Sequence, residues 1–317
     1  MSAAPPKRGE FELIAHLFAP LTQGAASAKN LRDDAAFLKV SPGCELVVTI
    51  DTVIAGVHFR HDDSPDLIAR KALRVNLSDL AAKGAKPVGF LQALSLNDGI
   101  SDAYLEKYAR GLAADIAEFQ CPLLGGDTTS GQGPLTVSVT AFGEVEAGKG
   151  VLRSGAKPGD ILFVTGTIGD GALGLACLMG SLLKSDALIR RYQLPQPRVG
   201  LPLSGLASAG LDISDGLVAD VGHLCAASGV GAVIERTKIP LSSDARAAVE
   251  RDKMWWEKIL TGGDDYEIAF TVPATRAADA KRLNATAIGT ITAGSGVQVV
   301  DESGKAISFG VTGYRHR

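Results

Sequence analysis

Residues 46 to 59 read LVVTIDTVIAGVHF, an apolar and β-branched run that reaches a carboxylate at Asp51 and an imidazole at His58. The run from Leu46 to Ile50 predicts a strand that is buried on both faces. If this strand ends at Asp51, the carboxylate would lie at the rim of a sheet, where α/β proteins bind their ligands. An aspartate after a strand is more often a turn residue or a helix cap. Asp51 is therefore a candidate site residue only in combination with other acidic residues of the chain.

The length and composition predict a globular protein of two domains. The 317 residues exceed the roughly 250–300 at which a single hydrophobic core stops growing. The segment 143–159 contains five glycines without periodicity, so we place the boundary there, with domains at 1–148 and 149–317. The net charge of −3, with no block of Lys or Arg, argues against a nucleic-acid partner.

The same composition indicates a cytoplasmic location without membrane contact. The four cysteines lie far apart in the sequence, which is typical of reduced thiols in the cytoplasm. The first residues contain no apolar segment of a signal peptide. The longest apolar stretch, 172–183, is about half of the ~20 residues that span a bilayer, so we expect it to form a buried helix.

The clearest predicted helix covers residues 64–84. Ser64 fits an N-cap, and Gly84 fits the position that follows a last turn. Nearly all sides of this helix are apolar, which predicts that it is buried. Asp79 lies among these residues, where a carboxylate is costly unless it is hydrogen-bonded or binds a metal. We favour a metal or ligand contact over a hydrogen bond to neighbouring backbone.

Glycine-rich segments accompany the remaining predicted elements. Gly125-Gly126-Asp127 would let the backbone approach a ligand, although the same residues are common in turns. Residues 166–171 are a weak phosphate-loop signal that close helix–strand packing explains equally well. The patterns predict strands at 90–96, 135–141, 161–165 and 268–272. They also predict a helix at 102–119 and a second helix that is opened by residues 212–217 and ends at Ser228.

Two polar signatures occur once in each predicted domain. NLSD ends at Asp79 and GGD at Asp127, which is 48 positions later, whereas DISD ends at Asp215 and GGD at Asp264, which is 49 positions later. This similarity hints at paired αβ units without establishing a duplication.

Several aspartates would need to be neutralised if these segments converge. No comparable number of Lys or Arg residues lies near them, so they would repel one another without cations. Oxygen ligands without cysteine favour Mg²⁺ or Mn²⁺ over zinc or copper. Such ions beside glycine-rich turns describe a site for nucleotide phosphates. The eight residues are Asp33, Asp34, Asp51, Asp79, Asp127, Asp212, Asp215 and Asp264.

Taken together, these motifs resemble the thiamine-monophosphate kinase family. The resemblance runs in family order from Gly9 to the C-terminus, and some motifs are shared with aminoimidazole ribonucleotide synthetase, selenophosphate synthetase and the hydrogenase-maturation dehydratase. The motifs are GEFELI (9–14), DDAA (33–36), TIDT with GVHF (49–59), KAL with NLSDLAA (71–82), GGDTT (125–129), RSGAKPGD (153–160), DISDGL (212–217) and GGDDYE (262–267).

The resemblance implies an α/β (α+β) chain of two domains with the aminoimidazole ribonucleotide synthetase-like fold. The N-terminal domain would be a mixed sheet with helices, and the C-terminal domain an α/β unit. The expected assembly is a homodimer joined through the N-terminal sheets, with ATP bound near the interface. The implied reaction transfers the γ-phosphoryl group of ATP to the phosphate of thiamine monophosphate, giving thiamine diphosphate and ADP, with several Mg²⁺ ions.

The resemblance also assigns roles by position. No general base is assigned, because the second pKa of a phosphate monoester is about 6 and the acceptor is already largely dianionic at neutral pH. The expected Mg²⁺ ligands are Asp34, Thr49, Ile50, Asp51, Asp79, Asp127, Asp212 and Asp215. ATP contacts are expected from Gly126, Asp127, Arg153 and Ser214, and contacts to the thiamine substrate from His58, Asp264 and Tyr314.

A few positions depart from the family pattern. Arg32 replaces a glycine before the aspartate pair, and Ile50 replaces a threonine, so only its carbonyl group could bind a metal. Asp264 replaces a glutamate and is one methylene shorter. An aromatic residue that would stack on the substrate is replaced by Val311, for which Phe309 or Tyr314 could compensate.

Two alternatives remain open at this stage. The first is another ATP-dependent enzyme of the superfamily, although no cysteine precedes Cys44 and the chain ends in RHR, unlike selenophosphate synthetase and the hydrogenase-maturation enzyme. The second is a non-catalytic nucleotide-binding regulator. The complete set of aspartates argues against loss of the catalytic site.

Overall fold

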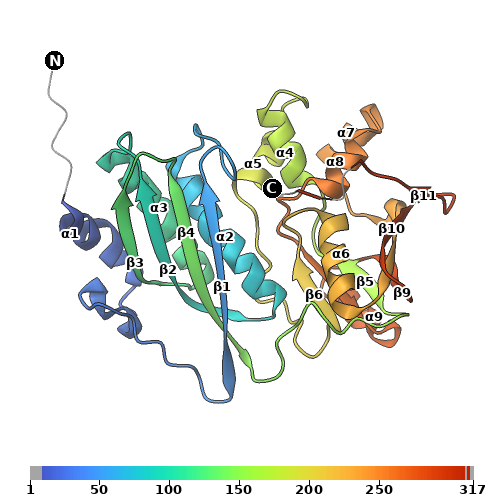
Figure 1. Cartoon of the computed structure of the whole chain (residues 1–317), viewed down its shortest axis with the longest axis horizontal. Coiled ribbons are helices and arrows are strands. Elements are labelled where there is room, and N and C mark those ends of the chain that lie inside the picture. The colour runs from blue at the N-terminus through green and yellow to red at the C-terminus, as the bar shows by residue number, and fades with distance from the viewer. Residues whose placement is uncertain (1–8, 311–312, 315–317) are drawn as a thin grey trace. The chain divides into compact units, whose positions relative to one another are not determined.

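The computed structural model describes residues 9–310 and 313–314, which form two compact units (Figure 1). Unit 1 comprises Met1–Leu80 and Lys86–Glu146, and unit 2 comprises Ala81–Ala85 and Ala147–Arg317. The domain boundary at residue 148 remains a prediction. Val311 lies outside the described residues.

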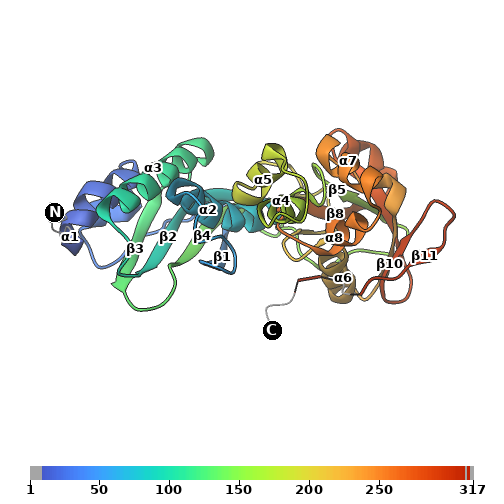
Figure 2. The ribbon, with the colours of Figure 1, turned by 90° about the horizontal axis from the view of Figure 1, so that it is seen from above.

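Unit 1 is built on a four-stranded mixed sheet with the order β1-β4-β2-β3. β1 and β2 are antiparallel to β4, whereas β3 is parallel to β2. Helices α2 and α3 cover one face of this sheet (Figures 1 and 2). The elements are β1 (Cys44–Ile54), α2 (Pro65–Ala82), β2 (Lys86–Leu96), α3 (Asp102–Phe119), β3 (Leu123–Ser130) and β4 (Thr136–Glu146), preceded by α1 (Glu10–Leu13), η1 (Ile14–Phe18), η2 (Ala19–Thr22) and η3 (Ala26–Leu31).

A buried ion pair joins the two helices of unit 1. Arg74 donates from Nε and Nη2 to the two carboxylate oxygens of Asp115, at 2.7 and 2.8 Å. Arg70 donates to the same carboxylate at 2.7 Å. Arg74 and Asp115 are almost fully buried, and the fork-like geometry satisfies both charges. The predicted burial of α2 is therefore confirmed, but part of its buried surface is an ion pair that the apolar pattern did not reveal.

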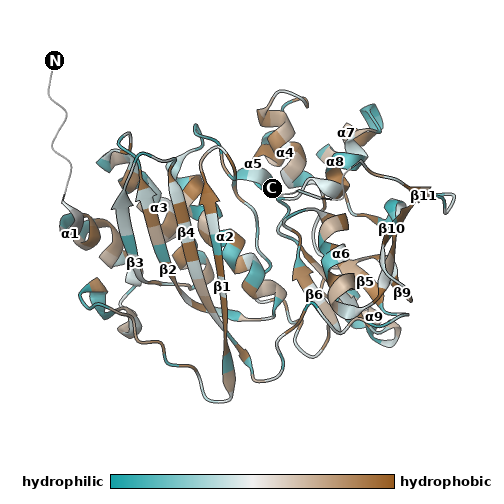
Figure 3. Cartoon of the chain, viewed as in Figure 1, coloured by the Kyte–Doolittle hydropathy of each residue, from teal (hydrophilic) through white to brown (hydrophobic). Residues whose placement is uncertain are grey.

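The prediction that the first strand is buried on both faces is wrong. β1 is an edge strand of the described sheet, and Leu46, Val48 and Ile50 are 36%, 53% and 65% exposed. Figure 3 shows the apolar residues along this strand. β1 also continues to Ile54, so Asp51 lies within the strand and not at its end. An apolar run indicates that its residues are shielded from water, but it does not indicate whether the same chain or another chain covers them.

Unit 2 contains a seven-stranded sheet with the order β11-β10-β7-β9-β5-β8-β6. Among its described strand pairs only β10 and β7 are parallel. The strands are β5 (Ile161–Val164), β6 (Ala209–Asp212), β7 (Gly231–Glu235), β8 (Ile268–Val272), β9 (Thr286–Thr292), β10 (Gly296–Val300) and β11 (Ala306–Ile307). The helices are α4 (Asp170–Leu178), α5 (Asp186–Gln193), α6 (Leu217–Ser228), α7 (Ser243–Arg251), α8 (Trp255–Thr261) and α9 (Ala277–Lys281), with short turns η4 (Arg236–Lys238) and η5 (Ala274–Arg276).

The central strands of unit 2 separate two apolar cores. Leu162 and Val164 of β5 belong to the core that includes the apolar side of α6. Phe163 points to the other face, where its ring stacks on that of Phe270 at 5.7 Å between centroids. Burial on both faces, which was expected for β1, is found here. None of the helices within the described part of the chain is long and apolar enough to cross a membrane.

The helix predicted over 172–183 is shorter than expected. α4 ends at Leu178, and Met179 and Leu183 are largely exposed. At its start, the N–H groups of Gly169 and Gly171 donate to the buried carboxylate of Asp265 at 2.8–3.2 Å. An internal carboxylate thus occupies the position that a phosphate would take in a phosphate loop, which favours the packing interpretation of this turn.

The two similar signatures do not form equivalent structures. NLSD lies within α2, whereas DISD begins at the last residue of β6 and continues into the connection to α6. The first GGD lies within β3, and the second follows α8. The hint of paired αβ units is therefore wrong.

Candidate active site

Thr49, Asp51 and Asp79 form an oxygen-rich group between β1 and α2. Thr49 and Asp51 are alternate residues of β1 and share the face that the helices cover. Thr49 Oγ1 donates to Asp79 Oδ2 at 2.5 Å. All three residues are partly buried. The side chain of Ile50 lies on the opposite, exposed face, so only its backbone belongs to this group.

Asn76 adds an unsatisfied acceptor one turn before Asp79. Its side chain is fully buried and donates from Nδ2 to the carbonyl of Ala72 at 3.0 Å. Its Oδ1 has no hydrogen-bond partner among the residues that the structure describes. Buried acceptors are rarely left without a donor, and residues three apart on a helix are neighbours. A set of oxygen donors with a spare buried acceptor fits a hydrated divalent cation such as Mg²⁺.

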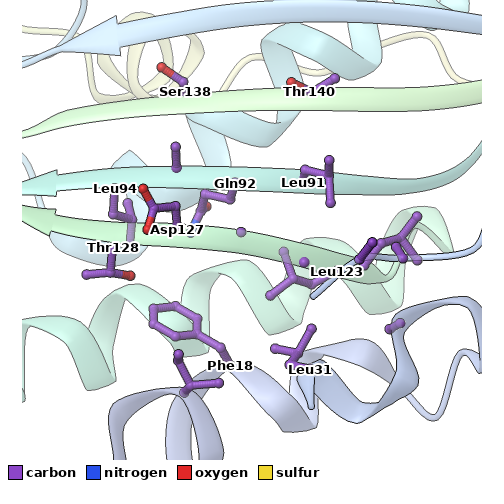
Figure 4. Close-up of a pocket in the computed structure, with 18 of the residues that line it drawn as sticks. Phe18, Leu31, Leu91, Gln92, Leu94, Leu123, Asp127, Thr128, Ser138 and Thr140 are labelled. Carbon is purple, nitrogen blue, oxygen red and sulfur yellow. The ribbon is translucent and has the colours of Figure 1, made fainter. Parts of the chain in front are cut away.

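A second acidic group lines a cavity of about 830 Å³ in unit 1 (Figure 4). Asp33 and Asp34 reach it from the N-terminal segment, and Asp127 from β3. Gly125-Gly126-Asp127 belongs to this strand, so the alternative interpretation as a turn is wrong. A Cβ atom on Gly126 would lie 2.1 Å from the carbonyl oxygen of Gln92, which explains the glycine. The apolar lining includes Phe18, Leu31, Leu91, Leu94 and Leu123.

The described chain does not bring Asp127 to Asp51. Asp51 pairs with Val139, whereas Asp127 shares its row with Ala93 and Ser138. Consecutive residues of β4 point to opposite faces, and paired residues share a face. The two aspartates therefore lie on opposite faces and on opposite edges of the sheet, about 14 Å apart at ~4.8 Å per strand.

His58 is fixed by contacts on both sides of the turn after β1. Its Nδ1 accepts from the N–H of Ile54 at 3.1 Å. The buried ammonium group of Lys71 donates to the carbonyl of His58 at 2.9 Å. Gly56, with φ of +82°, makes the turn possible. The imidazole is therefore oriented by the backbone before any ligand binds.

In unit 2 the predicted residues cluster at the junction of β6 and α6. Asp212 ends the strand, and Ser214 and Asp215 form the connection to the helix. Asp220, in the first turn of α6, accepts from the N–H groups of Ser214, Asp215 and Gly216 at 3.0–3.1 Å. Burial, together with the nearby charge of Asp215, raises the pKa of Asp220 to about 7. Asp220 was not among the residues predicted from the sequence, although an acidic residue in a first helical turn is a capping signal.

The GGDDYE segment runs directly beside this connection. Asp264 N–H donates to the carbonyl of Ser214 at 2.9 Å, and Tyr266 N–H to that of Ile213 at 2.8 Å. A Cβ atom on Gly263 would lie 2.2 Å from the same Ser214 carbonyl oxygen. Asp264 and Tyr266 have positive φ angles of 63° and 52°, a conformation that is costly without support. The structure therefore brings Asp264 together with Ser214 and Asp215.

Two buried acidic residues hold the GGDDYE segment in place. Asp265 is bound by the start of α4, as described above, and burial raises the pKa of its carboxyl well above the ordinary value. Glu267 is fully buried and accepts from Arg191 at 2.9 Å and from Arg198 Nε at 2.6 Å. These supporting contacts could not be predicted from the sequence, because their partners lie about 70 to 100 positions away.

Tyr314 lies near the same connection, whereas Arg153 does not. Tyr314 N–H donates to the Asp215 carbonyl at 2.9 Å, and its half-exposed ring lines a cavity of about 590 Å³ with Trp255 and Lys258. Phe309 packs against the core instead. Arg153 is exposed, and its carbonyl accepts from Ser228 at the opposite end of α6, about 18 Å from the start of this 12-residue helix.

Family models match most of the chain. The N-terminal domain of AIR synthase related proteins matches residues 32–145, and the C-terminal domain of these proteins matches residues 157–302. A thiamine-monophosphate kinase of Caulobacter vibrioides is 45% identical over 308 residues, which cover 93% of this chain and 87% of that protein. The thiamine-monophosphate kinase of Escherichia coli K12 is 42% identical, covering 84% and 83%.

Solved structures agree with these sequence matches. Thiamine-monophosphate kinase from Stenotrophomonas maltophilia K279a is 38% identical with a TM-score of 0.82, covering 94% of this chain and 98% of that one. AaThiL complexed with AMPPCP and TMP is 33% identical with a TM-score of 0.79, covering 99% and 100%. Hydrogenase maturation protein HypE in complex with ATP is 17% identical with a TM-score of 0.77, a likeness of fold alone.

Proposed function

The chain belongs to the thiamine-monophosphate kinase family, and we propose that the oxygen-rich groups described above supply its metal and nucleotide site. It phosphorylates thiamine monophosphate to thiamine diphosphate at the expense of ATP. The observation that carries this conclusion is the 45% identity over 93% of the chain. The two-domain α/β fold expected from the resemblance is confirmed.

We propose that Thr49, Asp51 and Asp79 hold Mg²⁺, with the backbone of Ile50 beside them. The donor set consists of oxygens, and Asn76 Oδ1 is a buried acceptor one helical turn from Asp79 with no hydrogen-bond partner among the described residues. When bound, Mg²⁺ would offset the negative charge of the transferring phosphates. The predicted ligands Asp34 and Asp127 belong to the second acidic group, and Asp212 and Asp215 to unit 2.

The protein has little proton transfer to perform. The acceptor phosphate is already largely dianionic, because its second pKa is about 6. Nδ1 of His58 accepts a hydrogen bond from Ile54 N–H, so this nitrogen cannot take up a proton from a substrate. We therefore propose that His58 positions the substrate.

We propose that Asp264 and Tyr314 contact the thiamine moiety. The thiazolium ring is cationic, and cations bind favourably to aromatic faces. Tyr314 and Trp255 line one cavity with the acidic residues Asp252 and Glu257. This combination of aromatic and acidic groups suits a ring that carries positive charge.

A homodimer formed through the sheet of unit 1 is also proposed. The exposed residues Leu46, Val48 and Ile50 project from one face of an edge strand. Exposed apolar rows of this kind commonly mark protein interfaces. A second copy that covers this face would also bring its own residues to the cavity that contains Asp127, because Ile50 belongs to the exposed row and also lines that cavity. A cytoplasmic location remains a prediction.

One incubation separates the proposed activity from its alternatives. The purified chain is mixed with ATP, Mg²⁺ and thiamine monophosphate, and the thiamine products are separated chromatographically. Formation of thiamine diphosphate together with ADP is expected. ATP binding without product would favour the regulator, and ATP hydrolysis without thiamine diphosphate would favour another enzyme of the superfamily.

A further inference from the structure

Asp220 is a buried acidic residue next to the predicted ligands of unit 2. A single oxygen, Oδ2, accepts from three consecutive backbone N–H groups, those of Ser214, Asp215 and Gly216, at 3.0, 3.0 and 3.1 Å. The side chain is only 4% exposed. Consecutive N–H groups that converge on one point form an anion-binding nest. Asp220 therefore fills a nest that the chain itself builds.

The filled nest restricts how Ser214 can contact a nucleotide. The start of a helix is a common phosphate site because its N–H groups are unpaired, but here those of residues 214–216 are used by Asp220. The carbonyl of Ser214 accepts from Asp264 N–H at 2.9 Å. Both backbone groups of Ser214 are thus engaged within the protein. Its hydroxyl is the group that remains to contact ATP.

The same contacts make Oδ2 of Asp220 unsuitable as a metal ligand. Asp215, Asp220 and His223 each have a potential ligand atom within 4.8 Å of the others. However, three N–H dipoles point at Oδ2 of Asp220, and their positive ends would repel a cation. The Asp220 carboxylate binds the backbone of residues 214–216. The side chain in this segment that could bind a metal is therefore Asp215.

We propose that Asp220 is a positioning residue for phosphoryl transfer. It fixes residues 214–216 so that the Ser214 hydroxyl and the Asp215 carboxylate face the nucleotide and its metal, and through Ser214 it also fixes Asp264. The proposal rests on the proposed function in assigning Ser214 and Asp215 to the site. Its central claim concerns geometry: Asp220 is required as a hydrogen-bond acceptor and not as a charge.

Amide hydrogen exchange tests, without an activity assay, whether Asp220 fixes the backbone of residues 214–216. In Asp220→Ala, the amides of residues 214–216 should exchange markedly faster than in the wild type, whereas Asp220→Asn, which keeps an oxygen acceptor, should protect them. Asp170→Asn is the matched control: Asp170 is also buried in a first helical turn, but its partners are the hydroxyls of Thr167 and Ser242. This control should leave exchange at 214–216 unchanged. Equal protection in Asp220→Ala and wild type would overturn the proposal.

Kinetics test the functional half. For enzyme variants shown to be folded, Asp220→Ala should raise the Mg²⁺ concentration for half-maximal activity, or lower kcat, by about 10- to 100-fold, the usual loss for residues that orient metal ligands. Asp220→Asn should stay near wild type. If Asp220→Ala does not fold, Asp220→Glu replaces it: the longer charged side chain should displace the connection and perform worse than Asn. A Glu variant more active than the Asn variant would show that charge matters and would overturn the proposal.

The two failures remain distinguishable. If the wild type makes no thiamine diphosphate, the proposed function fails, while the exchange data still report on the nest. If the wild type is active and the exchange at 214–216 rises in Asp220→Ala without any change in Mg²⁺ dependence or kcat, the proposed function stands and the positioning role is overturned.

Discussion

Carboxylates in this protein occupy two kinds of environment. Asp51 and Asp79 are partly buried, and Asp79 accepts a hydrogen bond from the hydroxyl of Thr49. Asp220 and Asp265 are enclosed, and backbone N–H groups donate to them. We propose that a cation relieves the repulsion in the first environment, whereas the second already satisfies the carboxylate with the chain's own donors. The first kind is suited to ligand binding and the second to holding loops in place.

At the residue scale, removing a charge from the first environment should abolish turnover. Asp79→Asn keeps the size of the side chain and can still accept from Thr49, so the fold should persist, but the affinity for the cation should fall. We expect a loss of at least about 100-fold in kcat/KM, in the range seen when one electrostatic group is removed from an active site. Asp186→Asn, an exposed first-turn residue of α5, is the control. Wild-type turnover in folded Asp79→Asn would contradict the metal assignment.

The second environment should give a pH-dependent stability. Burial holds the pKa of Asp265 well above its ordinary value, so the folded state retains a proton that the unfolded state loses above about pH 4. The free energy of unfolding should therefore fall as the pH rises from about 4 through the folded pKa, by up to ~1.4 kcal/mol per pH unit. Urea unfolding at several pH values should show a flatter curve for Asp265→Asn, while Asp186→Asn follows the wild type. Parallel curves for wild type and Asp265→Asn would show that Asp265 does not hold this proton.

Sequence reasoning identified the first kind of carboxylate but not the second. Asp79 was recognisable because it interrupts an apolar helix, and Asp51 because it interrupts an apolar strand. Asp265 and Glu267 gave no such signal, since their role depends on N–H and guanidinium donors about 70 to 100 positions away in the chain.

At the element scale, β3 depends on the absence of a side chain at Gly126. A Cβ atom there would lie 2.1 Å from a backbone oxygen of β2, whereas one on Gly131 would have nothing within 4 Å. Gly126→Ala should therefore destabilise the protein by about 1–3 kcal/mol, the usual cost of overpacking, and Gly131→Ala much less. Chemical denaturation of the two variants gives the comparison. Equal stabilities would mean that the strands separate easily at this edge.

β1 illustrates where an element can be predicted and its environment cannot. The β-branched residues predicted that a strand forms here, but they did not predict that Leu46, Val48 and Ile50 would be exposed. Apolar residues on both faces of a strand indicate burial in the assembly, and helices α2 and α3 cover only the face opposite this row. The buried strand β5 carries the same pattern and is covered by its own unit on both faces.

The exposed row predicts a specific effect on assembly. Val48→Asp places a charge in the middle of the row and should shift a dimer toward monomers at micromolar concentration, because an unpaired charge in an interface is strongly unfavourable. Val57 is equally exposed, at 53%, but lies beyond the strand, so Val57→Asp is the matched control. Sedimentation velocity should show the shift for Val48→Asp alone. An unchanged mass for both variants would place the interface elsewhere.

At the scale of the whole molecule, each of the two units contains acidic residues and contacts that hold them in place. The division into two parts was predictable from length and glycine content, whereas the roles assigned to the site residues from their motifs remain predictions. The separation of Asp51 and Asp127 onto opposite faces of one sheet was not predictable, because it depends on strand order and register. The residues of a single motif do not reveal which distant strand pairs with it, or in which register.

The central claim is that the chain transfers the γ-phosphoryl group of ATP to the phosphate of thiamine monophosphate. Its most direct test uses ATP labelled with ¹⁸O in the γ-phosphoryl group, with Mg²⁺ and thiamine monophosphate, followed by mass spectrometry of all products. We predict that the label appears in the terminal phosphate of thiamine diphosphate and that ADP forms in equal amount. Label recovered only in inorganic phosphate, or formation of AMP in place of ADP, would contradict the claim.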